Sequence, residues 1–511
     1  MSLSIRNALA ALPAGDGYRL ERVNIGIRDG VIAAIEPAGR DDEPEGGRGR
    51  WAEILDASDF LAIPGLINAH THSHAVLARG TFRNLPLEVA SPLIAAGRVG
   101  ASEREVYVGA LLQAAESLRH GTTALLDHLE QPEPGLEAAA QAYLDAGIRA
   151  VLVPSIRNRP YYETLPSGAG VIPLEVRARL EAHPLPTAEA YLATCRRLVK
   201  AWHGRAGRLT VGIGPSTPFR CTEDVLEGAR RLASDEGLTL HTHLLETRVQ
   251  AATAWQLYGR SMVAYARDLG LLGPRTSLAH AIWVEAADLP LLAASGATVV
   301  HNPISNFVSG AGIAPIHRLR AAGVPIALGT DSPNTCGLLS VFESLRLVAS
   351  LANTAEPDYE RWIGPAEGLR MATAIGAQAL GLGGETGELA VGRRADLVLI
   401  DLTRSWYTPL NDPLFQLAYG ETGAGVDTVI VEGRVLVKGG RNLTIDEAAL
   451  RREAATLGEA MMARNRDEFA FARSQEPYIR RIYRAVHGLA DESAERLGGP
   501  PMAGKDRRTD D

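Results

Sequence analysis

A repeated alternation of short apolar runs and amphipathic segments fills the middle of the chain and constrains its fold more than any other feature. Runs of strand length are separated by segments with helical apolar spacing, such as Glu103–Leu118 and Ala188–Trp202. The expected strands are Leu61–His70, Thr122–His128, Ile148–Ile156, Leu209–Pro215, Leu238–Leu244, Thr276–Trp283, Ala297–His301 and Pro325–Thr330. Eight strands, each followed by a helix, predict an α/β protein with a (β/α)8 barrel of the TIM type rather than an open sheet.

The flanks of this region have a different pattern. Residues 1–60 and 385–440 consist of short apolar runs joined by turn residues. Neither flank alone can bury a sheet, so we expect the two to combine into one small β-sandwich domain, beside a barrel of residues 61–384. Residues 441–497 are expected to form C-terminal helices. Residues 498–511, rich in Gly, Pro and charge, are expected to be a disordered tail.

Composition narrows the classes of partner. The formal net charge of −8, without a long basic run, argues against nucleic acid or an anionic membrane surface. No apolar stretch has the length of a membrane span, and the first residues lack the pattern of a secretory signal. The cysteines Cys195, Cys221 and Cys336 are far apart, which fits a reducing compartment. We therefore expect a cytoplasmic protein that acts on a small molecule.

Histidines concentrate at the ends of the expected strands. Of the 13 histidines, those at or just past a C-terminal strand end are His70, His72, His74, His128, His241, His243, His280 and His301. In a (β/α)8 barrel these strand ends meet on one face, which carries the active site. This distribution predicts an imidazole-rich site on that face.

Two His-Thr-His sequences indicate a metal site. Alternate residues of a strand point to the same face, so His70 and His72 can reach one ion, and His241 and His243 repeat this geometry. Asp331 ends the eighth expected strand, next to the first in a closed barrel. Together, His70, His72, His243 and Asp331 are the expected metal ligands. Imidazoles with one carboxylate suit Zn²⁺, or alternatively Fe²⁺, better than Mg²⁺ or Ca²⁺.

The other strand-end histidines allow two interpretations. His74 and His241 could contact substrate, but could equally support the ligands or pack against them. For His128 and His301, likewise, the sequence is compatible with a functional role and with a structural one. The sequence alone does not choose between these roles.

Several motifs in order resemble the amidohydrolase superfamily, and specifically its metal-dependent deaminase and chlorohydrolase branch. That branch includes methylthioadenosine/S-adenosylhomocysteine deaminases, guanine deaminases and triazine hydrolases. The motifs are Pro64-Gly65-Leu66-Ile67-Asn68-Ala69-His70-Thr71-His72, His243-Leu244-Leu245-Glu246-Thr247, Ala279-His280-Ala281, His301-Asn302-Pro303-Ile304-Ser305-Asn306 and Gly329-Thr330-Asp331-Ser332. The resemblance covers about residues 20–440.

The resemblance implies His70, His72, His243 and Asp331 as metal ligands, and Glu246, His280 and Asp331 as catalytic residues. Asp331 would accept a proton from the attacking water and pass it to the leaving group. His280 would hydrogen-bond the nucleophile, and Glu246 would protonate a ring nitrogen of the substrate.

The scarcity of lysine bears on the number of metal ions. Other branches of the superfamily bridge two metals with a carboxylated lysine on a barrel strand. The chain has only Lys200, Lys438 and Lys505, and none lies on an expected strand. We therefore expect one divalent ion.

The predicted reaction is hydrolytic deamination of an amino-substituted nitrogen heterocycle such as a purine, pyrimidine, pterin or triazine, with release of ammonia. The alternative is hydrolysis of another C–N or C–Cl bond, in a cyclic amide, a formimino compound or a chlorotriazine; a non-catalytic binding protein is the third hypothesis. The candidate substrate-binding residues are His74, His128, Arg157, His301 and Asn306, and residues 157–186 could form a lid over them. Relatives in this branch pair as dimers or tetramers, so a homo-oligomer is expected.

Overall fold

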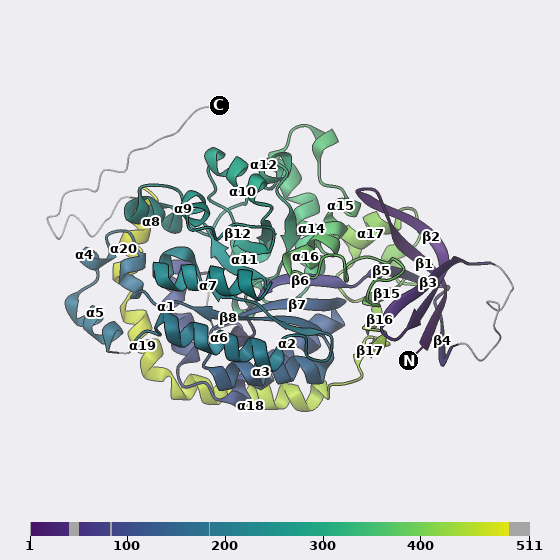
Figure 1. The fold of residues 1–511 in the computed structure, drawn as a ribbon, viewed down its shortest axis with the longest axis horizontal. Coiled ribbons are helices and arrows are strands. Elements are labelled where there is room, and N and C mark those ends of the chain that lie inside the picture. Colours follow the sequence, from purple (N-terminus) through teal and green to yellow (C-terminus); the bar gives the residue numbers. More distant parts are fainter. Residues whose placement is uncertain (1, 40–50, 82–83, 183, 490–511) are drawn as a thin grey trace.

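The computed structural model describes residues 2–39, 51–81, 84–182 and 184–489. Figure 1 shows an α/β body, in which helices surround central strands, and a strand-rich lobe at one end that holds the N-terminus. The expected tail, residues 498–511, lies outside the described residues. Within the described ranges, no helix combines the length and the apolar content needed to cross a bilayer.

The body contains two parallel sheets. The first has the order β10-β8-β7-β6, with β9 paired to β8, and the second has the order β11-β12-β13-β14. Their bounds are β6 Leu66–Thr71, β7 Thr122–Leu129, β8 Arg149–Ile156, β9 Leu209–Val211, β10 Gly214–Pro215, β11 Leu240–Leu244, β12 Thr276–His280, β13 Thr298–His301 and β14 Ile326–Leu328. Parallel bridges join Ile213 to Leu240 and Thr71 to Asp331, and so connect one sheet with the other at both edges.

Helices cover the outside of these strands, as the alternating pattern predicts. The helix α2 begins at a capping box between Ser102 and Glu105, and α3 ends at Gly147, whose positive φ of 85° suits glycine. The helices of the body are α1 Leu87–Arg98, α2 Glu103–Arg119, α3 Glu133–Ala146, α4 Gly168–Val171, α5 Leu174–Glu181, α6 Ala188–Trp202, α7 Glu223–Asp235, α8 Arg248–Tyr258, α9 Met262–Asp268, α10 Leu289–Ser295, α11 Pro303–Val308, α12 Ile316–Ala321, α13 Pro333–Cys336, α14 Val341–Ser350, α15 Pro365–Met371, α16 Ala374–Ala379 and α17 Pro413–Gly420. The expected C-terminal helical region contains α18 Glu447–Arg464, α19 Arg466–Ser474 and α20 Glu476–Val486.

The lobe is a nine-stranded sheet in which both flanks of the chain take part. Its strands are β1 Ser2–Ala14, β2 Gly17–Arg28, β3 Val31–Pro37, β4 Glu53–Asp56, β5 Phe60–Pro64, β15 Leu397–Asp401, β16 Val426–Val431, β17 Arg434–Lys438 and β18 Arg441–Asn442. The antiparallel pairing of β5 with β15 joins the N-terminal strands to the C-terminal ones. The long first strand, β1, is not among the strands that the sequence pattern singled out.

Three expectations about strands are wrong in detail. The run Leu61–His70 is two strands, because the chain leaves the lobe at Pro64 and enters the body at Leu66. At the junction, Gly65 packs against Thr123 so closely that a Cβ would lie 2.0 Å from its hydroxyl oxygen. The run Leu209–Pro215 is likewise divided between β9 and β10. Lys438 does end a strand, but that strand belongs to the lobe, and its Nζ faces Glu53 at 3.8 Å.

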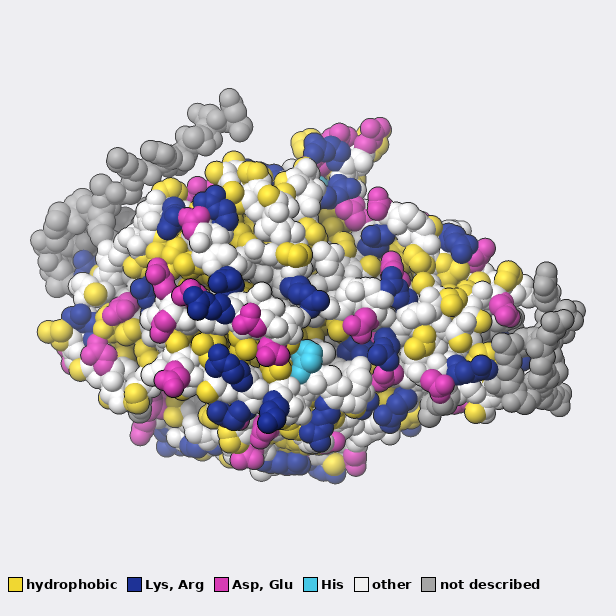
Figure 2. Space-filling view, viewed as in Figure 1, with side chains coloured by type: hydrophobic (Ala, Val, Ile, Leu, Met, Phe, Trp, Pro, Cys, Tyr) yellow, Lys and Arg dark blue, Asp and Glu magenta, His cyan; other side chains and the backbone are white. Residues whose placement is uncertain are grey.

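A buried ion pair links the body to the segments that return into the lobe. The Nε of Arg149, on β8, lies 2.8 Å from Asp396, and both side chains are almost fully buried. Asp396 also accepts hydrogen bonds from the Thr386 hydroxyl and the Glu432 backbone N–H. At the surface, by contrast, basic and acidic side chains are interspersed over the face of the body shown in Figure 2.

Candidate active site

The four expected metal ligands meet at the C-terminal ends of their strands. The Nε2 atoms of His70 and His72 lie 3.4 and 3.3 Å from Oδ1 of Asp331. The Nε2 atoms of His72 and His243 are 3.2 Å apart. Two donor atoms that each lie about 2.0 Å from a tetrahedral zinc ion are separated by about 3.3 Å. The spacing of these donors therefore fits one small divalent ion.

Hydrogen bonds on the far side of each ring orient these donors. Nδ1–H of His72 donates to the carbonyl oxygen of His128, and Nδ1–H of His243 donates to that of Ser216, both at 2.6 Å. Each ring therefore presents an unprotonated Nε2 to the site.

His70 is held by a longer relay. Its Nδ1 lies 2.8 Å from Nε2 of His241, whose own Nδ1 lies 2.7 Å from the Ser277 hydroxyl. With His241 donating to Ser277 and accepting from His70, Nε2 of His70 is left free, and this buried atom has no hydrogen-bond partner among the described residues. The relay places His241 behind His70, which is one of the two positions that the sequence left open for it.

The ionisation states suit a cation. Burial holds the pKa of His70 well below its usual range and lowers the pKa of His243 to about 3, so both rings are neutral. Burial alone would raise the pKa of Asp331, but the close approach of the His70 and His72 rings outweighs it and holds the pKa well below its usual range. Burial alone would lower the pKa of His72, but its contacts with Asp331 and the His128 carbonyl outweigh burial and raise it, so a divalent ion bound at this ring would replace a proton. Imidazoles with one carboxylate are a donor set that suits a divalent metal.

A second group of side chains lies beside the ligands. Nε2 of His280 is 3.6 Å from Oε2 of Glu246 and 3.9 Å from Oδ2 of Asp331. Nδ1 of His280 lies 2.9 Å from Oδ1 of Asn306, and the Ser305 hydroxyl donates to Asp331. Burial raises the pKa of Glu246 to about 7. A carboxyl group with that pKa can donate a proton near neutral pH.

The backbone at two of these residues is unusual. His280 has a φ of 79° and Asp331 a φ of 64°, both in the left-handed region that favours glycine. His280 is the last residue of β12 and Asp331 lies just past the end of β14, and at both points the backbone directs the side chain into the site. Such conformations persist where the surrounding structure enforces them and cluster at functional sites.

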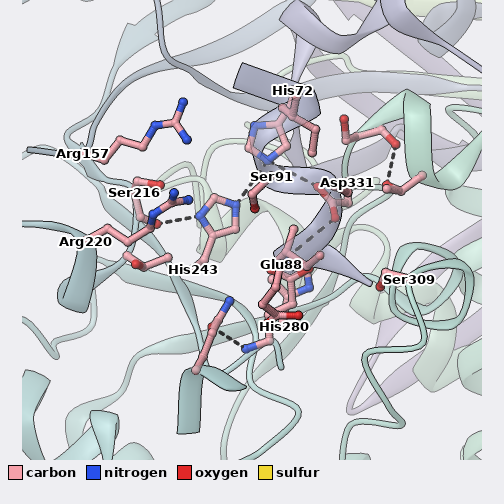
Figure 3. Close-up of a pocket in the computed structure, with 18 of the residues that line it drawn as sticks. His72, Glu88, Ser91, Arg157, Ser216, Arg220, His243, His280, Ser309 and Asp331 are labelled. Atoms are coloured by element: carbon pink, nitrogen blue, oxygen red, sulfur yellow. Dashed lines mark hydrogen bonds and ion pairs between the residues drawn. The ribbon is translucent and has the colours of Figure 1, made fainter. Parts of the chain in front are cut away.

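These residues open into a cavity of about 140 Å³. Figure 3 shows His72, His243, His280 and Asp331 around one space, with Arg157 and Arg220 beyond His243 on the side away from Asp331. The segment expected to form a lid supplies part of the wall, through Arg157, Tyr161, Thr164 and Leu165.

The candidate substrate contacts divide into two groups. His74, His128 and Arg157 line the cavity. Nδ1 of His74 is buried without a hydrogen-bond partner among the described residues, whereas Nε2 of His128 lies 3.1 Å from the carbonyl of Gly214. His301 and Asn306 are buried outside the cavity wall, and Asn306 instead holds His280 from behind.

The sequence interpretation did not single out several residues of the site. The carbonyl of Ser216 holds His243, and the hydroxyl of Ser305 holds Asp331. Glu88 and Arg220 line the cavity. Glu88 stands in the Leu-Pro-Leu-Glu segment after the first strand and Ser305 in the motif His301–Asn306, so both positions could have been noticed, but no local pattern marks Ser216 or Arg220.

The ends of the parallel strands carry three imidazoles, an aspartate and a protonatable glutamate. This combination defines a metal-dependent hydrolase. The chain belongs to the amidohydrolase family, whose model matches residues 61–436. Membership makes it a hydrolase of carbon–nitrogen bonds with a TIM-barrel-type α/β fold.

Similar proteins agree with this assignment. A 5'-deoxyadenosine deaminase of Methanosarcina acetivorans is 32% identical over 90% of this chain and 98% of its own length. The zinc-bound structure of an adenosine deaminase from Xanthomonas campestris has a TM-score of 0.79 and 27% identity, covering 90% of this chain and 98% of the other. The structure of a zinc-bound atrazine chlorohydrolase from Arthrobacter aurescens has a TM-score of 0.78 and 25% identity, covering 89% of this chain and 100% of the other.

Proposed function

We propose that this protein deaminates an amino-substituted nitrogen heterocycle, with an aminopurine as the first candidate. The observation that carries the proposal is the position of Glu246. Its carboxyl group has a pKa of about 7 and lies beside His280, in the cavity that is also lined by His72, His243 and Asp331. The names of the similar deaminases support an adenine-type ring as the substrate.

The residues have distinct proposed roles. His70, His72, His243 and Asp331 would hold a divalent ion, which would supply the Lewis acidity that activates water. Asp331 accepts the proton of the attacking water through the oxygen that faces His280. His280, whose Nδ1–H donates to Asn306, accepts a hydrogen bond from the water at Nε2 and orients it.

Glu246 acts on the substrate rather than on water. Its carboxylic acid protonates the ring nitrogen next to the carbon that bears the amino group, so that this carbon becomes electrophilic. Water adds to the carbon to give a tetrahedral intermediate. The proton held by Asp331 then passes to the amino group, and the C–N bond breaks to release ammonia. The hydroxyl group on the same carbon gives its proton to Glu246 as it becomes the ring carbonyl, which restores the acid form of Glu246.

The identity of the ion and the closure of the fold belong to the same proposal. Zinc is the proposed ion because both zinc-bound neighbours share this fold, and Fe²⁺ is the alternative. The bridges at Ile213–Leu240 and Thr71–Asp331 support closure of the two parallel sheets into an eight-stranded barrel. The nine-stranded sheet encloses its own apolar core, which supports a separate β-sandwich domain.

The boundaries of these domains follow from the strands. We place the sandwich strands within residues 2–64 and 397–442, the barrel strands within residues 66–328 and the C-terminal helices within residues 447–486. The cysteines at 195, 221 and 336 are free and buried, which supports a reducing, cytoplasmic location. A homo-oligomer stays a prediction, to be checked by light scattering.

A second reaction has one observation in its favour. The structure named as an atrazine chlorohydrolase covers 89% of this chain. Protonation of a ring nitrogen would activate a carbon that bears chlorine in the same way as one that bears an amino group. The same site could therefore hydrolyse a chlorotriazine.

One assay separates these reactions. The zinc-loaded protein is incubated with adenosine, 5'-deoxyadenosine, guanine, cytosine, pterin and atrazine, and ammonia and chloride are measured. Ammonia from an amino heterocycle, abolished by a chelator and restored by zinc, supports the proposal. Release of chloride without ammonia would select the alternative reaction. If no compound releases either product, both reactions are contradicted.

A further inference from the structure

Three arginines converge on one wall of the active-site cavity. Arg98 at the end of α1, Arg157 after β8 and Arg220 after β10 all line it. Glu130 is the carboxylate that pairs with two of them: its oxygens lie 3.2 Å from Nη1 of Arg98 and 2.8 Å from Nε of Arg157. The third guanidinium, that of Arg220, has no carboxylate within 4 Å among the residues that the structure describes.

Arg220 is held in place without being neutralised. Its backbone carbonyl accepts hydrogen bonds from the N–H groups of Asn158 and Arg159, and its guanidinium lies 5.0 Å from the ring centre of Tyr161. The Nε–H group is buried and has no hydrogen-bond partner among the described residues. Burial lowers the pKa of this guanidinium, because removal from water outweighs the attraction of Tyr161 and Glu130.

The acidic groups on this wall do not balance the arginines. Glu130 is shared by Arg98 and Arg157, and Glu88 is the other carboxyl group nearby. Glu88 accepts a hydrogen bond from the Thr247 hydroxyl, and burial raises its pKa. Even with both carboxyl groups ionised, the wall keeps an excess of positive charge.

The positions of the arginines also indicate the direction in which a bound substrate would extend. Arg157 and Arg220 line both the active-site cavity and a neighbouring cavity of about 160 Å³, which Phe471 and Gln475 bound from the C-terminal helical region. Figure 3 places both arginines on the side of His243 away from Asp331. A substituent on the ring undergoing deamination would therefore extend past His243 toward them.

We infer that the substrate carries an anionic group, a carboxylate or a phosphate, and that Arg220 is the residue that selects it, with Arg98 and Arg157 adding positive charge. A guanidinium with a buried, unpartnered N–H gains a charge-assisted hydrogen bond when an oxyanion reaches it. This inference rests on the proposed function, because the heterocycle bearing the anion is the one to be deaminated.

Matched pairs of compounds test the inference. The zinc-loaded enzyme is assayed with adenosine against adenosine 5'-monophosphate and adenosine-5'-carboxylic acid, and with pterin against pterin-6-carboxylic acid. Ammonia release gives kcat/KM, and isothermal titration calorimetry gives Kd without requiring turnover. The acidic member of at least one pair should be preferred by about tenfold or more, and whether the phosphate or the carboxylate is preferred identifies the anion.

Variants assign the preference to Arg220. Arg220→Gln should reduce the acid-to-neutral ratio by about ten- to a hundredfold, Arg220→Lys should restore part of it, and Arg196→Gln, an exposed arginine on α6, should leave it unchanged. If Arg220→Gln does not fold, the wild-type ratio still decides. A wild-type enzyme that never prefers the acidic member, or an unchanged ratio in folded Arg220→Gln, would overturn the inference.

The two proposals can fail separately. Ammonia release without a preference for the acidic members leaves deamination standing and removes the anion site. Preferential binding of the acidic members without ammonia release leaves the anion site standing and removes deamination of these rings.

Discussion

The Oε2 atom of Glu246 lies 3.6 Å from the Nε2 atom of His280. Both side chains are buried, and they come from the ends of neighbouring parallel strands, β11 and β12. Burial keeps the carboxyl group protonated up to about pH 7, so an acid and an imidazole that can orient water face the same small space. The proposed division of labour between them leads to experiments on each residue.

Glu246→Gln should separate catalysis from metal binding. Glutamine keeps the shape and the hydrogen-bonding capacity of the side chain but has no acidic proton, so kcat/KM should fall by about 10²- to 10⁴-fold. Zinc content, measured by mass spectrometry, should equal that of the wild type, because Glu246 is not among the proposed ligands. Loss of zinc would show that Glu246 is a ligand and not an acid.

Activity should decline as pH rises above about 7. A carboxyl group whose pKa is raised to about 7 holds its proton below that pH and loses it above, so the acidic form disappears on the alkaline side. A profile of kcat/KM between pH 5.5 and 9 should show this limb in the wild type. The residual activity of Glu246→Gln should lack it, and a limb that persists there would belong to another group.

Removal of the metal should abolish activity reversibly. Dialysis against a chelator should stop turnover and lower the melting temperature, because the ion stabilises the folded state to which it binds. Zinc should restore both. His243→Ala should bind zinc at least about tenfold more weakly, whereas His74→Ala, at the same strand end as His72, should keep it. Equal losses in the two variants would contradict the proposed ligand set.

Asn306 should act as a positioning residue for His280. Its Oδ1 accepts Nδ1–H of His280, so Asn306→Leu removes the bond that selects the tautomer. We expect kcat to fall by about 10- to 100-fold, with KM and zinc content changed little. Asn306→Asp keeps an acceptor at this position and should recover much of the activity. If KM rises and kcat is constant, Asn306 contacts substrate after all.

The buried pair of Arg149 and Asp396 should matter for stability and not for turnover. Arg149→Met leaves Asp396 buried without its partner, which should lower the free energy of unfolding by about 3–5 kcal/mol. Denaturant titration measures this change. Arg197→Met, which breaks an exposed pair with Glu133, should leave the midpoint nearly unchanged. If the free energy of unfolding falls by a similar amount in both variants, burial is not what makes the Arg149–Asp396 pair important for stability.

Much of the architecture was predictable because it depends on local patterns. Helix periodicity placed α6 at its observed bounds, and the alternation of side chains along a strand placed His70 and His72 on one face. The expectation that strand ends converge then brought in His243, His280 and Asp331 from distant parts of the chain. Each of these steps uses only the residue types within one short segment and a general rule about parallel strands.

Other features depend on packing between segments. The break between β5 and β6 falls within one continuous apolar run, and only the pairing of β5 with β15 shows that its first half belongs to the lobe. His241 and Asn306 resemble substrate contacts in sequence, but in the structure they lie behind His70 and His280. Whether a polar side chain faces the cavity or contacts the far side of a histidine ring depends on contacts between segments, which the local sequence does not specify.

The amino-acid sequence by itself determined the order of strands and helices, the donor atoms offered to a metal and the chemistry they favour, because these follow from local periodicity and residue type. Only the tertiary structure decided which ring nitrogen faces the candidate metal site, which carboxyl group stays protonated and which arginine of the cavity wall has no carboxylate nearby among the described residues. Those properties arise from burial and from contacts between segments far apart in the chain, and no single segment contains them.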